Sequence, residues 1–365
     1  MLQKFKKNPK LQNLLTNIDH NLEKILTKKE QINFMEICGT HTVSILKHGF
    51  RNYFTNRINF LSGPGCPVCV TSQYDIDKVI DLAQQGVHIA IFGDMMNVPG
   101  TTSSLEKEMA KGAKVDIVYN PLECLDLAQK SKEEIVFVAV GFETTIPVIA
   151  SLVLDAYENK IRNLSILNMV KTLPHILSFL LKNIELNLDG FICPGHVSVI
   201  IGEEPYKIIT EKYNIPVVIA GFEPVDLALA VESLLDQIRT GKPKVVNRYR
   251  RMVKPEGNIK ARELIDTVFE PADVKWRGFG KVPKTGLKLR EKFIDFRAER
   301  KFNIKPPKSK KITGCICDQI ITGKKKPVDC PLFIKKCNPN HPIGPCMVSM
   351  EGACSAYYKY GNKDK

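Results

Sequence analysis

Short apolar, β-branched runs alternate with longer amphipathic segments between residues 31 and 240, and this alternation constrains the fold more than any other feature. It is typical of a parallel sheet covered by helices, because each strand is buried on both faces and each crossover returns through a helix. The expected strands are Ile32 to Ile37, Ile58 to Leu61, Val87 to Phe92, Val115 to Tyr119, Ile135 to Val140, Leu164 to Leu167, Gly190 to Cys193 and Pro216 to Ala220. The expected helices are Ile76 to Gln85, Ile146 to Tyr157, Leu173 to Asn183 and Val225 to Arg239.

Eight such strands could close one barrel or form two open sheets, and a short repeat favours the second arrangement. Two strands end in the same tripeptide, Gly141-Phe142-Glu143 and Gly221-Phe222-Glu223, and a helix is expected after each. We therefore predict an α/β protein with two open parallel-sheet halves plus a C-terminal cysteine-rich iron–sulfur module. The predicted domains are an N-terminal helical segment at 1–30, α/β domains at 31–125 and 126–240, and an extended arm with a cluster domain at 241–365.

The charge and the terminal sequence limit the classes of partner and compartment. Lys and Arg exceed Asp and Glu by 53 to 39, a net charge of +14, yet no dense basic arm or basic–aromatic repeat indicates nucleic-acid binding. The segment from Met1 to Leu15 lacks the apolar region of a signal peptide, and no apolar run approaches the roughly 18 residues of a membrane span. We expect a cytoplasmic protein, in which the eleven cysteines serve metal or redox chemistry.

Two cysteine loops follow expected strands, at the sheet edge where α/β proteins bind ligands. Cys38 lies at a strand-to-helix turn, where helix N–H groups favour a thiolate, and His41 is a possible partner three residues on. The alternative is a buried, inert thiol. Cys66 and Cys69 form a Cys-x-x-Cys that permits a reversible disulfide, two ligands to a soft metal, or an ordinary turn. We expect this motif to lie in a loop, which argues against a thioredoxin site.

Several polar residues in neighbouring loops have two interpretations each. Glu143, Thr144 and Thr145 could orient a ligand, hydrogen-bond a thiol or cap the following helix, and a cap by Thr144 or Thr145 is the structural alternative. Asp94 and His196 have the same ambiguity. His88 stands alone in the sequence and is expected to be a satisfied side chain rather than a ligand.

Cysteines are concentrated near the C-terminus, where six of the eleven lie within the last 51 residues. Four of them follow the pattern Cys-x14-Cys-x6-Cys-x16-Cys, and two are left over. A zinc ribbon normally has two tight Cys-x2-Cys knuckles, so this wide spacing favours a [4Fe–4S] cluster over zinc. The four in the pattern are Cys315, Cys330, Cys337 and Cys354, and the remaining two are Cys317 and Cys346.

Five features in this order resemble the hydrogenase maturation protein HypD family over nearly the whole chain. They are Met35-Glu36-Ile37-Cys38-Gly39-Thr40-His41-Thr42, Gly63-Pro64-Gly65-Cys66-Pro67-Val68-Cys69, Gly141-Phe142-Glu143-Thr144-Thr145, Pro194-Gly195-His196-Val197-Ser198 and the C-terminal cysteine spacing. The resemblance implies a cytoplasmic scaffold that, with the small chaperone HypC, holds iron while the cyanide and carbon monoxide ligands of [NiFe]-hydrogenase are installed. Cyanide would come from a HypE-like partner that carries a thiocyanate supplied by a HypF-like carbamoyltransferase. The hydrogenase large-subunit precursor would be an indirect partner, and neither nucleic acid nor membrane is expected.

The resemblance also implies roles for single residues. Cys38 carries over as an iron-site thiolate, and Cys66 and Cys69 carry over as a redox pair that also touches iron. Glu143, Thr144 and His196 fall in matching motifs and would position ligands or relay protons, and His41 remains the candidate partner of Cys38. The implied cluster ligands are Cys315, Cys330, Cys337 and Cys354.

One cluster ligand stays open, because Cys317 could replace Cys315, and Asp318 stands where the family is expected to have glycine. Cys346 would be a spare thiol. Thiolates suit iron, and leaving cyanide on iron from thiocyanate requires two electrons, which a dithiol or a cluster can deliver. We therefore expect a redox-active assembly scaffold rather than a freestanding turnover enzyme. The alternatives are a cluster-containing dithiol–disulfide oxidoreductase and a nucleic-acid-binding protein with a structural zinc.

Overall fold

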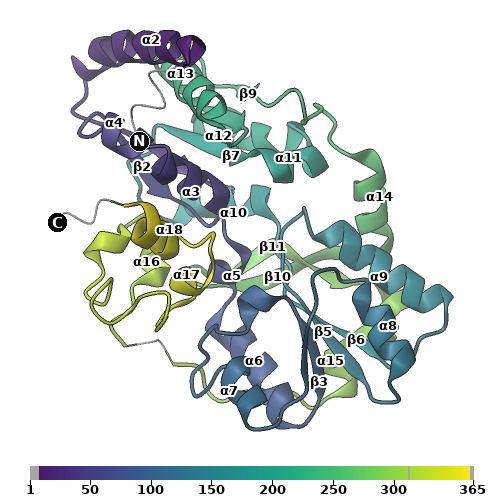
Figure 1. Ribbon diagram of the computed structural model, residues 1–365. Helices are drawn as coiled ribbons and strands as arrows, with labels where there is room; N and C mark the ends of the chain where they lie inside the picture. Colours follow the sequence, from purple (N-terminus) through teal and green to yellow (C-terminus); the bar gives the residue numbers. More distant parts are fainter. Residues whose placement is uncertain (1–7, 311–312, 362–365) are drawn as a thin grey trace.

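The computed structural model describes residues 8–310 and 313–361, which form two parallel sheets with helices on their faces and a cysteine-rich C-terminal module (Figure 1). The first sheet has the strand order β2-β1-β7-β8-β9, and the second has the order β4-β3-β5-β6. All eight expected strands are present, and the predicted α/β class with two open parallel sheets is confirmed. The strands are β1 Ile32–Glu36, β2 Ile58–Ser62, β3 His88–Ile91, β4 Val115–Ile117, β5 Ile135–Ala139, β6 Leu164–Asn168, β7 Gly190–Pro194, β8 Val217–Ala220 and β9 Val245–Asn247.

The predicted domain boundary near residue 125 does not separate the two sheets. β1 and β2 pair with the late strand β7, in the register of Phe34 opposite Gly190, while β3 to β6 form the second sheet by themselves. The chain therefore crosses between the sheets twice, after β2 and after β6. Apolar periodicity identifies a strand but not its neighbour, so the sequence could not place β7 beside β1.

The helices cover both sheets, and the four expected ones are confirmed within three residues at each end. The N-terminal helix begins at Pro9, because proline fits the first turn and the Asn8 side chain accepts a hydrogen bond from the Leu11 N–H at 3.3 Å. Residues 1–7 of the predicted N-terminal helical segment lie outside the described residues. Helices associated with the first sheet are α2 Pro9–Leu26, α3 Gly39–Lys47, α4 Phe50–Tyr53, α11 Gly195–Ile201, α12 Lys207–Tyr213 and α13 Pro224–Thr240. Those of the crossovers and the second sheet are α5 Pro67–Val70, α6 Gln73–Gln84, α7 Leu105–Ala110, α8 Glu123–Lys130, α9 Ile146–Glu158 and α10 Leu173–Asn183, and short 3-10 turns occur at η1 Gly93–Met95 and η2 Glu204–Tyr206.

The segment expected as an extended arm contains regular structure. After β9, α14 Ile259–Val268 leads into an antiparallel hairpin of β10 Phe269–Trp276 and β11 Gly280–Leu289. This hairpin pairs with both crossovers, through Trp276 opposite Thr71 and Gly286 opposite Lys171. Its outward residues are mostly charged or proline, which is why apolar periodicity did not reveal it. The short helices η3 Glu291–Phe296 and α15 Ala298–Lys301 follow it.

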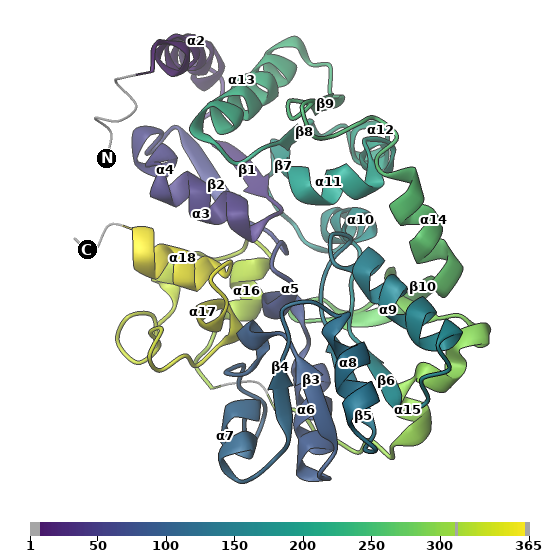
Figure 2. The ribbon, with the colours of Figure 1, turned by 45° about the vertical axis from the view of Figure 1, so that its right-hand side comes forward.

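The C-terminal module is built from short helices joined by turns, and it lies beside α3 and α5 in both ribbon views (Figure 2). Arg51 of α4 stacks over the ring of Tyr357 at 4.7 Å, which joins the module to the helices of the first sheet. Among the helices of residues 8–310 and 313–361, none is long and apolar enough to cross a membrane. The helices of the module are α16 Cys317–Ile321, η4 Pro327–Asp329, α17 Pro345–Val348 and α18 Ala353–Tyr360.

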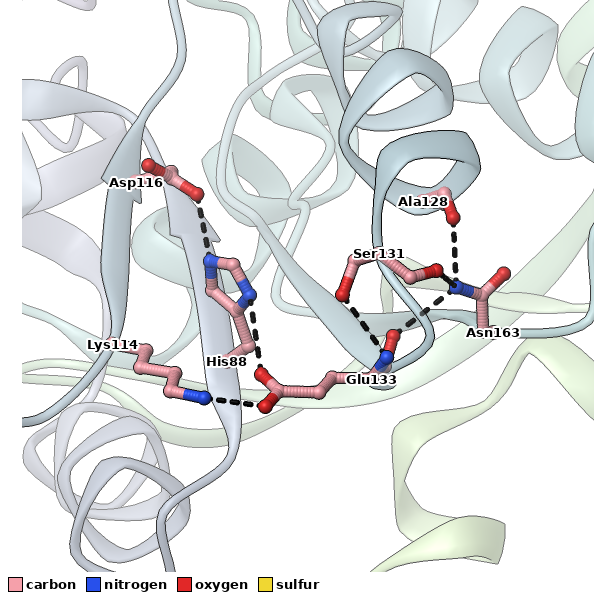
Figure 3. A network of polar contacts seen from close by, with 7 residues as sticks. All are labelled: His88, Lys114, Asp116, Ala128, Ser131, Glu133 and Asn163. Atoms are coloured by element: carbon pink, nitrogen blue, oxygen red, sulfur yellow. Dashed lines mark hydrogen bonds and ion pairs between the residues drawn. The ribbon is translucent and has the colours of Figure 1, made fainter.

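A polar network lies at the amino ends of the strands of the second sheet, away from the loops that follow their carboxyl ends (Figure 3). His88 at the start of β3 lies 2.7 Å from the Asp116 carboxylate and 3.9 Å from that of Glu133, which also pairs with Lys114. The Asn163 amide donates to three main-chain carbonyls of the α8–β5 connection. His88 is therefore held by Asp116 through Nε2 at 2.7 Å, whereas its Nδ1 is buried without a hydrogen-bond partner among the described residues, so the expected satisfied side chain is only half satisfied.

Candidate functional site

The Cys38 and Cys66 loops meet at the carboxyl ends of two adjacent strands. β1 and β2 pair in register up to Glu36 opposite Ser62, so the loops that follow them leave the sheet side by side. The Gly39 N–H donates to the Gly65 carbonyl at 3.3 Å, and a Cβ on Gly65 would lie only 2.3 Å from the Cys38 nitrogen. Glycine at position 65 is thus what allows the two loops to approach each other.

Cys38 is the N-cap residue of α3, at the strand-to-helix turn that the sequence predicts. Its thiol is buried, and this burial, followed by the nearby Glu351 carboxylate, raises the pKa of Cys38 to about 12. Desolvation therefore outweighs the helix N–H groups that were expected to favour a thiolate. A cation beside the sulfur would reverse this preference, because it supplies the charge that the buried thiolate lacks.

Glu36, a buried acid that the sequence-based candidates did not include, lies directly beneath Cys38. One carboxylate oxygen accepts from the Cys38 N–H at 3.3 Å, and the other accepts from the Thr42 hydroxyl. Burial raises the pKa of Glu36 to about 8. The signal in the sequence was a glutamate at the end of an otherwise apolar strand, within the motif that carries the family resemblance.

Cys66 and Cys69 form a close pair of buried thiols. Their sulfurs are 2.6 Å apart, and the Cys69 N–H points at the Cys66 sulfur at 3.3 Å. The expectation that the motif continues a loop is wrong, because Pro67 fits the first position of a helix and the short α5 begins there. Because the motif begins a helix directly, its local conformation does not exclude a thioredoxin-like site.

His41 and His196 flank the ring of Phe222, which belongs to the second copy of the repeated tripeptide. The His41 ring is 4.7 Å from Phe222, and the His196 ring is 3.8 Å from it on an edge. His41 Nε2 lies 2.9 Å from the Gly221 carbonyl, while Nδ1 is buried without a partner among the described residues. Burial lowers the pKa of His41 to about 4, so the ring is neutral. It is the main-chain N–H of His41, not the ring, that contacts the Cys38 sulfur.

Glu143 caps a helix, although not the one that follows it. One carboxylate oxygen accepts from the Leu173 N–H at the start of α10 at 2.8 Å, and the other is buried without a partner in the described chain. Burial raises the pKa of Glu143 to about 7. Thr145 precedes α9 without a side-chain cap, and Thr144 is exposed, so neither threonine takes the capping role considered from sequence.

A cleft of about 840 Å³ opens at the carboxyl edge of the second sheet. Asp94 and Thr144 line one side of it, and Glu351 of the C-terminal module lines the other. Glu351 also accepts from the Thr40 hydroxyl at 2.9 Å, which brings the module against the Cys38 loop. Nothing in the sequence around Glu351 marked it as part of this site.

The C-terminal cysteines converge on a small cavity with apolar walls. All four predicted cluster ligands line it, and Cys317 lines it as well. The donor set fits a sulfur-ligated iron cluster, because the thiols are the polar groups of a pocket otherwise walled by side chains such as Leu332 and Phe333. In the described residues, no three His, Cys, Asp or Glu side chains converge closely enough for a single metal ion.

The two left-over cysteines join the cavity to the dithiol. The Cys317 thiol contacts those of Cys315 and Cys354 on one side and that of Cys346 on the other. Cys346 in turn contacts Cys69. A continuous series of buried sulfurs thus runs from the Cys-x-x-Cys to the cavity, and Cys346 belongs to this series without lining the cavity.

Comparisons with known proteins identify relatives over nearly the whole chain. The family model of HypD, described as "Hydrogenase formation hypA family", matches residues 11–361. A putative hydrogenase expression/formation protein of Methanocaldococcus jannaschii is 45% identical over 340 residues, which are 93% of this chain and 95% of the relative. Hydrogenase maturation factors HypD of Azotobacter vinelandii and Rhodobacter capsulatus are 41% and 40% identical, each over 92% of this chain and 91% of their own length. The chain therefore belongs to the HypD family.

Proposed function

We propose that this chain, as a HypD family member with a role in hydrogenase maturation, is the iron-binding scaffold on which, together with a HypC-like chaperone, the Fe(CN)2CO unit of [NiFe]-hydrogenase is assembled. The observation that carries the proposal is the meeting of the Cys38 loop with the Cys66–Cys69 pair at one sheet edge, joined by sulfur contacts to the C-terminal cavity. Soft thiolate donors suit iron, and the paired thiols suit electron supply.

The chemistry assigned to the dithiol balances without a further reductant. A HypE-like partner presents a thiocyanate, whose S–C bond breaks to leave cyanide on the iron substrate and a thiol on the partner. Cys66 and Cys69 lose two electrons and two protons and form one S–S bond. One proton goes to the partner's sulfur, and the other leaves the site; Glu36, with its pKa raised to about 8 by burial, is suited to receive it when ionised.

The cysteine cavity is the proposed place of a resident [4Fe–4S] cluster, which would supply electrons that return the disulfide to the dithiol. Cys315, Cys330, Cys337 and Cys354 would hold it. Cys317 would then lie between the cluster ligands and Cys346, because its thiol contacts both. His41, Glu143, Thr144 and His196 are proposed to orient ligands or move protons in the loops around the iron substrate.

The cleft beside Thr144 and Glu351 is open enough for the partner segment that delivers the ligands. The hydrogenase large-subunit precursor would receive the finished unit indirectly, through the chaperone. We place these steps in the cytoplasm, where thiols remain reduced between cycles.

The test is a vibrational spectrum of anaerobically purified protein in the nitrile and carbonyl stretching region. Bands in both ranges, together with more iron than the four atoms of one cluster, are the expected result. The second candidate, a cluster-containing dithiol–disulfide oxidoreductase, is favoured by the 2.6 Å separation of the Cys66 and Cys69 sulfurs. It predicts no such bands, no additional iron, and turnover of a protein disulfide.

A further inference from the structure

The turn of the β10–β11 hairpin lies between the helix that carries the dithiol and the helix that carries Cys317. On one side, the Arg277 N–H donates to the Val70 carbonyl at 2.8 Å, and Trp276 pairs with Thr71. On the other side, Gly278 has a positive φ of 80°, and a Cβ there would lie 2.8 Å from the Asp318 carbonyl oxygen. One tight turn therefore touches both cysteine-bearing segments.

The Arg277 side chain adds to the contact with the dithiol segment. Its Nε donates to the Thr71 carbonyl at 3.1 Å, and its Nη1 donates to the Gln73 side chain at 3.2 Å. Val70 and Thr71 are at the C-terminal end of α5, where helix carbonyls lack partners within the helix. Arg277 therefore satisfies the end of the helix directly after Cys69.

A cavity of about 280 Å³ borders the turn, with Arg277, Cys315 and Cys317 among its lining residues. The Arg277 side chain borders this cavity, so shortening it would remove the donors to the Thr71 carbonyl and the Gln73 side chain.

We propose that Arg277 is a positioning residue for the Cys66–Cys69 pair, an inference that rests on the redox role proposed for that pair. Forming the disulfide removes two protons and two electrons from the two thiols, and the electrons pass to the thiocyanate of the partner. A fixed helix end keeps Cys69 beside Cys66, which raises the effective concentration of one thiol at the other and stabilises the disulfide. Loosening the helix end shifts the equilibrium towards the dithiol.

The test compares variants of the full chain, equilibrated anaerobically in glutathione buffers, with the dithiol-to-disulfide ratio read by alkylation and mass spectrometry. Arg277→Ala is expected to raise this ratio about tenfold, which for a two-electron couple is about 30 mV towards a more oxidising potential. Arg277→Lys keeps the charge but loses the planar fork, and it is expected to shift the ratio in the same direction. Lys281→Ala is the matched control, because this exposed cation of the same hairpin pairs with Asp273 and not with α5.

An Arg277→Ala ratio equal to that of the control would overturn the positioning role. The positioning role would also be wrong if Arg277→Ala shifted the dithiol-to-disulfide ratio while Arg277→Lys kept the wild-type ratio. In that case the positive charge of the side chain, and not its hydrogen-bond geometry, would set the ratio. A wild-type pair that stays reduced in every buffer would instead defeat the redox role itself, so the two failures are distinguishable. Amide exchange over residues 67–71 should quicken in Arg277→Ala and stay unchanged in Lys281→Ala, which separates a local loosening from global misfolding.

Discussion

Cys38 and Glu143 illustrate how burial sets the protonation of the site. Both side chains are removed from water, which raises the pKa of the Cys38 thiol to about 12 and that of the Glu143 carboxyl to about 7. Without a metal, the Cys38 thiol is therefore protonated at neutral pH, and Glu143 is only partly ionised. Binding of a cation would draw protons out of the site, so iron loading is expected to release protons and to strengthen as pH rises.

The variant Glu143→Gln tests whether burial keeps the Glu143 carboxyl protonated up to about pH 7. The folded chain holds a proton on Glu143 between pH 4.5 and about 7 that the unfolded chain releases. The stability contributed by this proton is full below pH 4.5 and is lost as pH rises through 7. The glutamine keeps the carbonyl that accepts from Leu173 but does not titrate. Wild type should lose about 2 kcal/mol of unfolding free energy relative to Glu143→Gln from pH 5 to 8, measured by denaturant titration. Parallel pH profiles would show that Glu143 is ionised throughout.

Cys38→Ser tests the proposed anchor for the iron substrate. Serine is a poor ligand for a soft metal, so the variant should lose the additional iron and its cyanide and carbonyl bands, and hydrogenase should remain immature in cells. The fold and the C-terminal cysteine site should persist, because neither uses this sulfur. Circular dichroism and the visible spectrum provide these controls. Normal maturation by Cys38→Ser would move the anchor to Cys66 and Cys69 or to a partner protein.

At the level of single residues, sequence reasoning located those that follow recognisable strands. Cys38 and Cys66 both lie where an apolar run ends before a helix, so the sheet edge could be inferred and its loops assigned to it. Glu351 could not be found in this way, because it reaches the site only through the packing of a segment more than 300 residues away in the chain. The reactive residue types of the loops could be recognised from the sequence, whereas residues that pack against the loops from far along the chain, such as Glu351, could not.

Secondary-structure elements could likewise be predicted only where the local sequence shows apolar periodicity. The eight expected strands and four expected helices carry strong apolar periodicity and occur where predicted. β9, α14 and the β10–β11 hairpin have short or largely exposed sequences and were assigned to an extended arm. Sheet order also escaped prediction, since the pairing of β1 with β7 depends on residues more than 150 positions apart.

The C-terminal module is the element whose folding should depend on a bound group. Its helices are short, from three to eight residues, and cannot form alone, whereas a cluster held by four thiols would contribute folding energy. Cys337→Ala should therefore abolish the broad visible absorption and make residues 313–361 sensitive to protease. Cys124→Ala is the control, because Cys124 is buried in α8 at the second sheet. An unchanged spectrum in Cys337→Ala would remove this residue from the cluster.

The whole molecule brings the two sheets, the crossover between them and the C-terminal module together around one site. The first sheet supplies Cys38, the crossover between the sheets supplies Cys66 and Cys69, and the second sheet supplies Thr144 in the cleft. The C-terminal module closes the arrangement through Glu351 and through the sulfur contacts of Cys346. Because the chain crosses between the sheets twice and the hairpin pairs with both crossovers, movement of one part should alter the spacing of the others.

The contact between α3 and the module gives a direct test of this dependence. A Cβ on Gly39 would lie 2.2 Å from the main-chain oxygen of Glu351, so alanine at this position requires one backbone to move. Gly39→Ala should displace the module while both sheets stay folded. Amide exchange over residues 345–361 should therefore quicken. Attack of the Cys346 thiol on an oxidised Cys66–Cys69 disulfide, which would release the Cys66 thiol, should slow, because the Cys69 and Cys346 sulfurs are in contact only when the module is docked.

Gly93→Ala is the matched control for that displacement. Gly93 also follows a strand, but its closest neighbour is the end of the Ile117 side chain at 3.2 Å, which can shift at little cost. The control should therefore keep wild-type exchange over residues 345–361. If Gly39→Ala behaved like Gly93→Ala, the module would have to be held against the first sheet by the Arg51–Tyr357 contact without the close approach of α3 to Glu351. The spacing of Cys69 and Cys346 would then be independent of the Cys38 loop, and the sheets and the C-terminal module would not act as one unit.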